Sequence, residues 1–333
     1  MSSITQLGNK LYTGEFSINF IGRKTIWYLT STAVIVLAVL ATVLRGGFTF
    51  GIEFRGGSEF QISNPTSTSV AIAEETVHQT IGEDAGTKVT VVGESTVRVQ
   101  TDQLTTEETD TLRGELAGAY GVDINSVTSS FIGASWGSDI TVQALRALLI
   151  FLVLVSIVMA LYFRTWKMSL AAFVAVIHDL VITAAVYGAF GFEVTPAAVI
   201  GLLTILGYSL YDTVVVFDKI RENTSIAYDE SNRRFADSVN LAVNQTLVRS
   251  INTSVVAALP VASILFIGSL LLGAGTLRDI ALSLFVGIIC GAYSTIFIAA
   301  PFYAQLREKE SESAKQGTKQ KTTIQRDASG AVR

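Results

Sequence analysis

Six apolar runs, each close to the length of a membrane-spanning helix, divide the chain. They cover residues 26–44, 144–163, 168–190, 196–217, 245–267 and 277–303. A helix needs about 20 apolar residues to cross the hydrocarbon core of a bilayer. The first run is too long for the apolar part of a cleaved signal peptide, and no small-residue cleavage site follows it. The pattern therefore predicts an α-helical polytopic membrane protein with six transmembrane helices.

Residues 46–139, between the first and second runs, alternate in polarity and contain no spanning run. Alternation around the Gly56–Gly57 pair predicts strand from Phe50 to Ile62. Further strands are predicted over 88–92, 96–100 and 123–132, and helices over 67–81 and 105–120. This β-α-β-β-α-β order is the ferredoxin-like pattern, and a segment of this length can bury its own core. We therefore predict an α+β ferredoxin-like domain between the first and second transmembrane helices.

Basic residues gather on one side of the predicted bundle. They are Arg23, Lys24, Arg164, Lys167, Lys219, Arg221, Arg233, Arg234, Arg307, Lys309, Lys315, Lys319, Lys321 and Arg326. Loops rich in Lys and Arg remain in the cytoplasm. We therefore expect a cytoplasmic N-terminus over 1–25, a cytoplasmic C-terminus over 307–333 and an extracytoplasmic 46–139 domain.

These assignments divide the chain further. The first helix is predicted over 26–45, and the other five helices occupy 140–306 with a cytoplasmic loop at 218–244. The tail 307–333 is rich in Lys, Glu, Ser, Gln and Thr, a composition typical of disorder.

Composition narrows the function classes. Half of the residues are hydrophobic and 16% are charged, and the net charge of −4 gives no indication of nucleic-acid binding. A single cysteine, Cys290, and two distant histidines exclude a disulfide framework and a zinc motif. The sequence contains no nucleotide-binding loop or nucleophile elbow. It therefore predicts a non-enzymatic membrane protein without a cofactor.

Asp212 lies within the fourth apolar run, and Arg249 lies near the start of the fifth. A charged side chain in the bilayer centre costs about 2.5–3.5 kcal/mol on insertion scales and usually serves a function. The two runs are antiparallel, so Asp212 and Arg249 can meet at similar depth and form an ion pair. The alternatives are that Asp212 lies at a helix end in the headgroup zone and that Arg249 extends to the membrane surface.

His178 and Asp179 are adjacent near the middle of the third run. They either extend an ion path or form structural hydrogen bonds between helices. In the sixth run, small residues recur at four-residue steps, which predicts close helix packing. These small residues are Ser283, Gly287, Gly291 and Thr295.

Five motifs together resemble the SecF family. They are GIEFRGG at 51–57, VIHDLVIT at 176–183, GYSLYDTVVVFDKIREN at 207–223, TLVRSINTS at 246–254 and GAYSTIFIA at 291–299. The third of these motifs is the most specific. Beyond Asp212 and Arg249, the family motif residues are Gly51, Glu53, Gly56, Gly57, Gly207, Asp218, Arg221, Glu222 and Asn223.

The resemblance implies a function in protein export. SecF belongs to the resistance-nodulation-division superfamily and pairs with SecD, which supplies the other half of the bundle and a second carboxylate. The pair uses the ion-motive force to promote late steps of Sec-dependent translocation across the cytoplasmic (inner) membrane. Its partners are then the SecYEG translocon with SecA, the translocating polypeptide and membrane lipid. Asp212 corresponds to the family's proton-coupling residue, and Arg249 to the arginine of a second motif.

The chain departs from the family pattern at three positions. Glu53 stands where many members have Asp, Tyr211 where Asn is frequent, and Lys219 where Arg is common. Tyr211 directly precedes Asp212 and leaves the coupling ion open between a proton and sodium. Two alternative functions also remain. One alternative function is a non-coupling scaffold subunit of the translocon. The other is half of a small-molecule or lipid exporter of the same superfamily.

Overall fold

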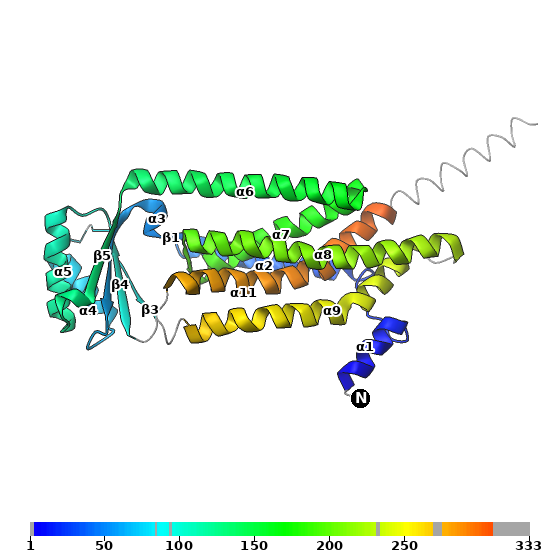
Figure 1. The fold of residues 1–333 in the computed structure, drawn as a ribbon, viewed down its shortest axis with the longest axis horizontal. Helices are drawn as coiled ribbons and strands as arrows, with labels where there is room; N and C mark the ends of the chain where they lie inside the picture. The colour runs from blue at the N-terminus through cyan, green and yellow to red at the C-terminus, as the bar shows by residue number, and fades with distance from the viewer. Residues whose placement is uncertain (1–2, 84, 93–94, 231–233, 269–274, 309–333) are drawn as a thin grey trace, which may run out of the picture.

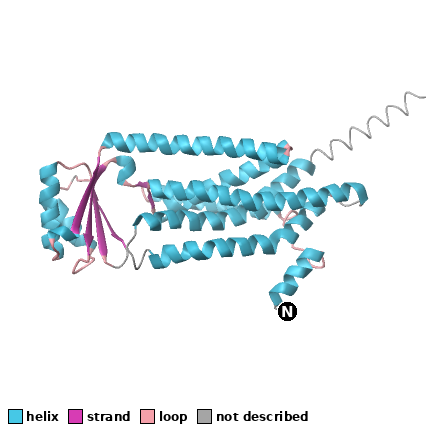
Figure 2. Ribbon diagram, in the orientation of Figure 1, coloured by secondary structure: helices cyan, strands magenta, loops and turns pink. Residues whose placement is uncertain are grey.

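Long helices form an elongated bundle with a small α/β domain at one end (Figures 1 and 2). The computed structural model describes residues 3–308 except 84, 93–94, 231–233 and 269–274. The long helices are α2 (Lys24–Leu44), α6 (Ala134–Phe163), α7 (Trp166–Phe190), α8 (Pro196–Glu230), α9 (Phe235–Ser263) and α11 (Gly275–Ser294). Within these described residues, six helices are long and apolar enough to cross a membrane, which confirms the predicted number.

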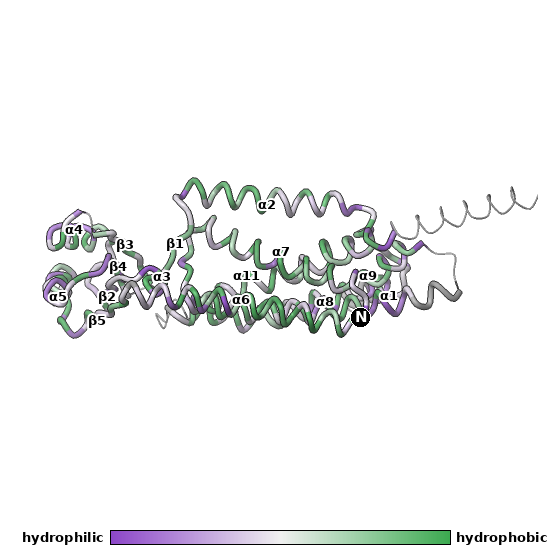
Figure 3. Tube along the Cα trace, turned by 90° about the horizontal axis from the view of Figure 1, so that it is seen from above, coloured by the Kyte–Doolittle hydropathy of each residue, from purple (hydrophilic) through white to green (hydrophobic). Residues whose placement is uncertain are grey.

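The two ends of the bundle differ. We call the end that carries the α/β domain the domain end, and the other, where the N-terminus lies, the terminal end (Figure 1). A short helix, α1 (Ser3–Thr13), lies at the terminal end beside α9. In Figure 3 apolar positions run along the long helices, whereas hydrophilic positions concentrate in the domain and near the terminal end. Two π-helical turns, η2 (Ile264–Gly268) and η3 (Thr295–Ala299), continue α9 and α11.

The segment predicted as the cytoplasmic loop 218–244 is largely helical in the structure. Helix α8 runs to Glu230 and α9 begins at Phe235. The apolar spacing continues beyond the hydrophobic run, and Ile220 and Val239 are fully buried in the bundle core. An amphipathic extension of this kind lowers the hydropathy without ending the helix.

The predicted boundary at residue 139 lies inside a helix. Strand β5 (Val127–Ile132) is separated from α6 by Gly133 alone. Along α6, Leu145 and Leu149 are exposed by 57% and 63%. Close to the terminal end the helix becomes buried, with Met159 at 4% and Phe163 at 1% exposure. Helix α6 therefore packs on the bundle core mainly through its last three to four turns, from Phe151 to Phe163.

Small residues bring α8 and α11 together. A Cβ atom on Gly287 would lie 2.4 Å from Ile205 Cγ2, and one on Gly291 would lie 2.7 Å from Ser209 Oγ. Thr295 continues this series with a hydrogen bond to Thr213. The four-residue steps in the sixth run therefore mark a close helix contact, as predicted.

The α/β domain has one apolar and one polar sheet face. Its elements are β2 (Gly57–Ser63), α4 (Val70–Thr80), β3 (Lys88–Val92), β4 (Thr96–Thr101), α5 (Thr106–Tyr120) and β5, in the predicted β-α-β-β-α-β order. The antiparallel sheet has the order β3-β4-β2-β5. Phe60, Val97 and Val99 are fully buried in a core with residues of α4 and α5. The helices lie on the side away from the bundle, so the other sheet face points toward it (Figure 1).

The segment from Phe50 to Ile62, predicted as strand on both sides of a break at Gly56–Gly57, is strand only in part. Thr49–Phe50 form β1, which pairs in parallel with β6 (Glu193–Val194) in the α7–α8 connection. Ile52–Arg55 form a helical turn, α3. Gly57 has a φ of +137° and a Cβ there would lie 2.4 Å from the Thr101 carbonyl oxygen, so only glycine fits. The two glycines turn the chain from α3 into β2.

The start of α5 gives a first prediction. Thr105 Oγ1 accepts from the Glu108 backbone N–H, and Glu108 Oε2 accepts from the Thr105 N–H at 2.8 Å. Thr105→Ala should therefore destabilise the first turn by about 1 kcal/mol. The Thr105 N–H and the Thr105 hydroxyl both donate to Glu108 Oε2 and lower the pKa of Glu108. Their contribution is therefore present at neutral pH and lost as the pH falls below the ordinary glutamate range.

Hydrogen exchange of the first-turn amides of α5 in the intact protein measures this effect. Thr111→Ala on the same helix is the matched control, because Thr111 is exposed and bonds only the Glu107 carbonyl within the helix. Equal exchange rates in the two variants would contradict the predicted role of the cap.

Candidate functional site

Asp212 lies inside the bundle where α8 faces α9, and is 6% exposed. Its Oδ1 accepts a hydrogen bond of 2.8 Å from Ser250 Oγ on α9. Its Oδ2 is buried and has no hydrogen-bond partner. A buried carboxylate with one free oxygen is costly when charged, because a single hydroxyl does not replace its hydration. Asp212 therefore lies in the interior of the bundle and not at the end of α8, which continues to Glu230.

The predicted ion pair between Asp212 and Arg249 is not formed. Among the described residues, no acidic oxygen lies within 4.0 Å of the Arg249 guanidinium, and this residue is exposed on the bundle surface. Consecutive residues point about 100° apart around a helix of 3.6 residues per turn. Ser250 therefore faces α8, and its neighbour Arg249 points to the outside of α9.

His178 and Asp179 connect three helices. His178 Nε2 lies 2.6 Å from Ser31 Oγ on α2, and Asp179 Oδ2 accepts from Ser209 Oγ on α8 at 2.5 Å. His178 Nδ1 and Asp179 Oδ1 are 3.7 Å apart. Asp179 is 2% exposed. These contacts match the structural alternative for the pair, in which both residues form hydrogen bonds between helices.

The two buried aspartates are joined through one face of α8. Ser209, which binds Asp179, precedes Asp212 by three residues and therefore lies one turn away on the same face. Thr213 bonds the Ser209 carbonyl and lies 2.9 Å from Thr295 Oγ1 on η3. We name this set the polar core: Asp179, Ser209, Asp212, Thr213, Ser250 and Thr295. It brings carboxylates and hydroxyls from α7, α8, α9 and η3 together inside an apolar bundle.

The sequence prediction missed the hydroxyl members of the polar core. Ser209 and Ser250 lie inside the two motifs that contain Asp212 and Arg249, but hydroxyl residues are common in membrane helices and give little signal alone. The three-residue separation of Ser209 from Asp212 is the signal that could have identified it.

The remaining residues of the long motif lie toward the terminal end, on the extension of α8. Asp218 accepts a 2.6 Å hydrogen bond from Tyr162 on α6, and Asn223 donates to Gln245 on α9 at 2.8 Å. Glu222 pairs with Lys219 at 2.8 Å, and Arg221 is exposed. Asp218 and Asn223 thus join α8 to its neighbours more than one and a half turns beyond Asp212.

The glycines of the motifs have different surroundings. Gly207 is exposed, and a Cβ there would meet nothing within 4 Å. Gly51 donates its N–H to the Val194 carbonyl at 2.9 Å and so attaches the start of α3 to the α7–α8 connection. Gly56 and Gly57 form the turn described above, and Glu53 is half-buried beside Gly51.

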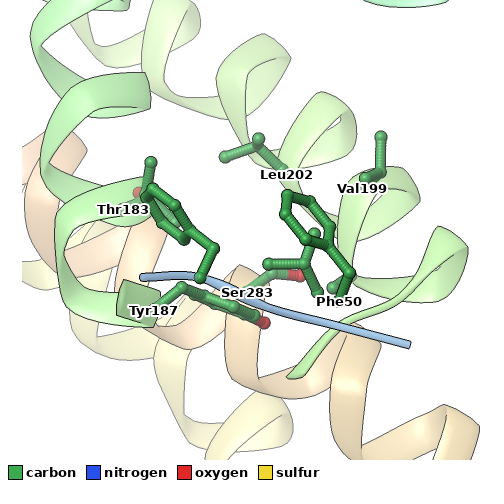
Figure 4. Close-up of a pocket in the computed structure, with 10 residues that line it drawn as sticks. Phe50, Thr183, Tyr187, Val199, Leu202 and Ser283 are labelled. Carbon is green, nitrogen blue, oxygen red and sulfur yellow. The ribbon is translucent and has the colours of Figure 1, made fainter. Parts of the chain in front are cut away.

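An apolar pocket of about 190 Å³ lies beneath β1 and β6 at the domain end. Figure 4 shows Phe50, Tyr187, Val199 and Leu202 around it, with the hydroxyl residues Thr183 and Ser283. Its lining is otherwise hydrophobic, so it separates the polar domain end from the polar core. Within the described part of the chain, no group of three or more His, Cys, Asp or Glu residues could hold a metal ion.

Comparisons with known proteins point to one family. The family model for the protein export membrane protein SecD/SecF, C-terminal, matches residues 113–309. Protein translocase subunit SecF of Streptomyces coelicolor is 46% identical over 310 residues, which cover 93% of this chain and 82% of that protein. The corresponding subunit of Mycobacterium tuberculosis strain H37Rv is 43% identical over 312 residues, with 90% and 70% coverage.

Solved structures agree with these sequence matches. The crystal structure of SecDF from Thermus thermophilus has a TM-score of 0.75 and 30% identity, and the match covers 88% of this chain and 39% of that chain. A second SecDF structure, in a super-membrane-facing form, has a TM-score of 0.61 with 90% and 40% coverage. This chain therefore corresponds to less than half of SecDF.

Proposed function

Since the chain belongs to the SecF family of protein translocase subunits, we propose that it works with SecD to couple the ion-motive force to protein translocation. The family relation makes it a multi-pass membrane protein with a role in translocation. The observation that carries the coupling proposal is Asp212, a buried carboxylate with one oxygen bound by Ser250 and one oxygen free.

The free oxygen of Asp212 provides the chemistry for coupling. In the charged state Oδ2 lies buried without a donor, and a proton that binds there neutralises the carboxylate. Ser250 can donate to Oδ1 in both states, so the contact with α9 survives the change of charge. Asp212 can therefore gain and lose a proton while α8 and α9 stay together, and the change in charge alters their packing with a partner.

The partner is proposed to be SecD, bound on the open face of α8 and α9. Gly207 and Tyr211 lie on this face, and Tyr211 is 55% exposed. A Cβ on Gly207 would meet no other described residue within 4 Å, which supports a role of its small size in an approach from outside. Arg249 points out of α9 and would there meet the second carboxylate, which the family resemblance assigns to SecD.

The energy available sets the scale of the mechanism. One charge that crosses the full membrane potential provides about 2.3 kcal/mol per 100 mV. This amount is enough to change the balance between two helix packings and too small to move a long polypeptide in one step. Several ion cycles would therefore be needed for each exported chain, and the subunit itself carries out no covalent catalysis.

The proposed orientation follows from the basic residues. Lys24, Arg164, Lys167 and Arg221 all lie toward the terminal end of the bundle, which is proposed to be cytoplasmic with both termini. The α/β domain would then face the outside of the cytoplasmic membrane, where an emerging polypeptide leaves the SecYEG channel. SecA would act on the cytoplasmic side.

The test uses vesicles that contain SecYEG, SecA, SecD and this chain. A proton ionophore and a sodium ionophore are added separately while export of a secreted protein is measured. We expect one of them to remove the stimulation that depends on this chain, and the effective ionophore identifies the ion. If this chain still stimulates export without either gradient while the SecD complex stays intact, coupling is refuted and a scaffold role is favoured.

A further inference from the structure

The polar face of the domain sheet meets the α7–α8 connection through three charged side chains. Arg98 on β4 and Lys88 on β3 point from the sheet toward the bundle, and Glu193 on β6 faces them. We name these three residues the clasp. Its ion pairs cross from the α/β domain to the bundle.

Burial makes the clasp energetically important. The Arg98 and Glu193 side chains are each 13% exposed, and Lys88 is 29% exposed. Burial lowers the pKa of Lys88, and it raises the pKa of the neighbouring Glu53. Charges removed from water in this way require opposite charges nearby, so the clasp can close only when domain and bundle approach each other.

The ion pairs of the clasp are long. Arg98 Nη1 lies 3.6 Å from Glu193 Oε2, and Lys88 Nζ lies 3.8 Å from Glu193 Oε1. Arg98 Nε and Glu193 Oε1 are buried without a hydrogen-bond partner. A tightly fixed charged hydrogen bond spans about 2.7–2.9 Å. The clasp therefore brings charges together without the short hydrogen bonds that fix the polar core, where Asp212 and Ser250 are 2.8 Å apart.

The bundle side of the clasp is firmly anchored. Thr195, two residues after Glu193, donates to Asp279 of α11 at 2.9 Å. Tyr187 of α7 donates to the Asp279 carbonyl at 3.3 Å. Glu193 is thus connected to α7 and α11. The segment before the sheet is held to the bundle by the pairing of β1 with β6, by the Gly51 N–H that donates to Val194 at 2.9 Å, and by packing of α3 on α6. The sheet face itself meets the α7–α8 connection through the long ion pairs.

We propose that Arg98, Lys88 and Glu193 form a releasable clasp that holds the α/β domain in this position against the bundle. The clasp opens when the domain moves away, and its charges then become hydrated. This inference rests on the proposed function in one respect only, which is that the movement of the α/β domain serves protein export.

Distance measurements between spin labels test the clasp in the full chain with SecD. One label replaces the exposed Thr111 on α5 and the other replaces the exposed Thr276 at the start of α11, with the buried Cys290 changed to Ala. Glu193→Gln removes both crossing pairs at nearly constant size. We expect a second, longer distance, with the ratio of open to closed molecules raised about tenfold.

Glu59→Gln is the matched control. Glu59 lies 3.6 Å from Arg98 Nε but belongs to the domain itself, so its loss breaks a similar pair that does not cross to the bundle. The control should keep the distance of the unchanged protein. Arg98→Gln removes the main crossing pair from the domain side and should give the same result as Glu193→Gln. It provides an independent test if the Glu193→Gln variant does not fold.

Unchanged distances in both Glu193→Gln and Arg98→Gln would overturn the clasp. So would an equal shift in Glu59→Gln. The measurement is made without an ion gradient, so a failure of ion coupling does not affect it. If the clasp opens as expected but export proves independent of both gradients, the clasp stands and the proposed coupling function is refuted.

Discussion

Replacement of Asp212 by Asn should abolish the ion-driven stimulation of export and leave the chain folded and bound to SecD. Asn has nearly the same size as Asp, and its carbonyl oxygen can still accept from Ser250. It cannot take up or release a proton at neutral pH. We therefore expect export in the presence of an ion gradient to fall to the level measured after the gradient is dissipated.

Asp218→Asn is the matched control for this experiment. It makes the same chemical change on the same helix, but Asp218 is exposed and accepts from Tyr162 on the side of α6. Gradient-dependent export by purified components and co-purification of SecD are measured for both variants. If export by the Asp212→Asn variant is still stimulated by the ion gradient, the coupling role belongs to another group.

A methyl group added at Gly287 should lower the free energy of unfolding of the bundle by about 1–3 kcal/mol. The new Cβ would lie 2.4 Å from Ile205 Cγ2 and 3.1 Å from Ile205 Cβ. Ile205 is 3% exposed and β-branched, so its side chain cannot rotate away without a clash. Helices α8 and α11 must therefore separate slightly, which also strains the contact between Thr213 and Thr295 just over two turns further along.

Thermal unfolding in detergent compares Gly287→Ala with Gly207→Ala. Gly207 lies on α8 as well, but a Cβ there meets no atom within 4 Å. We expect the Gly207 variant to unfold at the temperature of the unchanged chain, or slightly higher because alanine favours helix. A loss of stability of equal size in both variants would show that the glycines affect helix propensity and not packing.

The transmembrane helices could be predicted from sequence because a bilayer allows little else. Every backbone polar group in the hydrocarbon region must be paired, so long apolar runs become helices. The ends of the helices were less predictable. The segment 218–244 is polar enough to suggest a loop, yet Ile220 and Val239 keep the helical spacing and are buried on its inner side. A mean hydropathy does not detect such one-sided burial.

The site could be predicted in part. Asp179 and Asp212 stand out because carboxylates are rare in apolar runs, and both are buried in the polar core. Their partners depend on how each helix is rotated about its axis. Arg249 and Ser250 are adjacent in sequence, and charge alone favours Arg249, but the packing of α9 turns Ser250 toward Asp212. The rotation of a helix about its axis is set by tertiary contacts, and the sequence pattern does not specify these contacts.

The direct connection of β5 to α6 has a mechanical consequence. Only Gly133 lies between them, so a tilt of the sheet is transmitted directly to the start of α6, a helix of 30 residues. Helix α6 is fixed to the bundle near Met159 and Phe163, and the apolar side chains in its middle are exposed. Because α3 also packs on the first turns of α6 near Gly137, we expect any tilt of α6 to move the sheet with it.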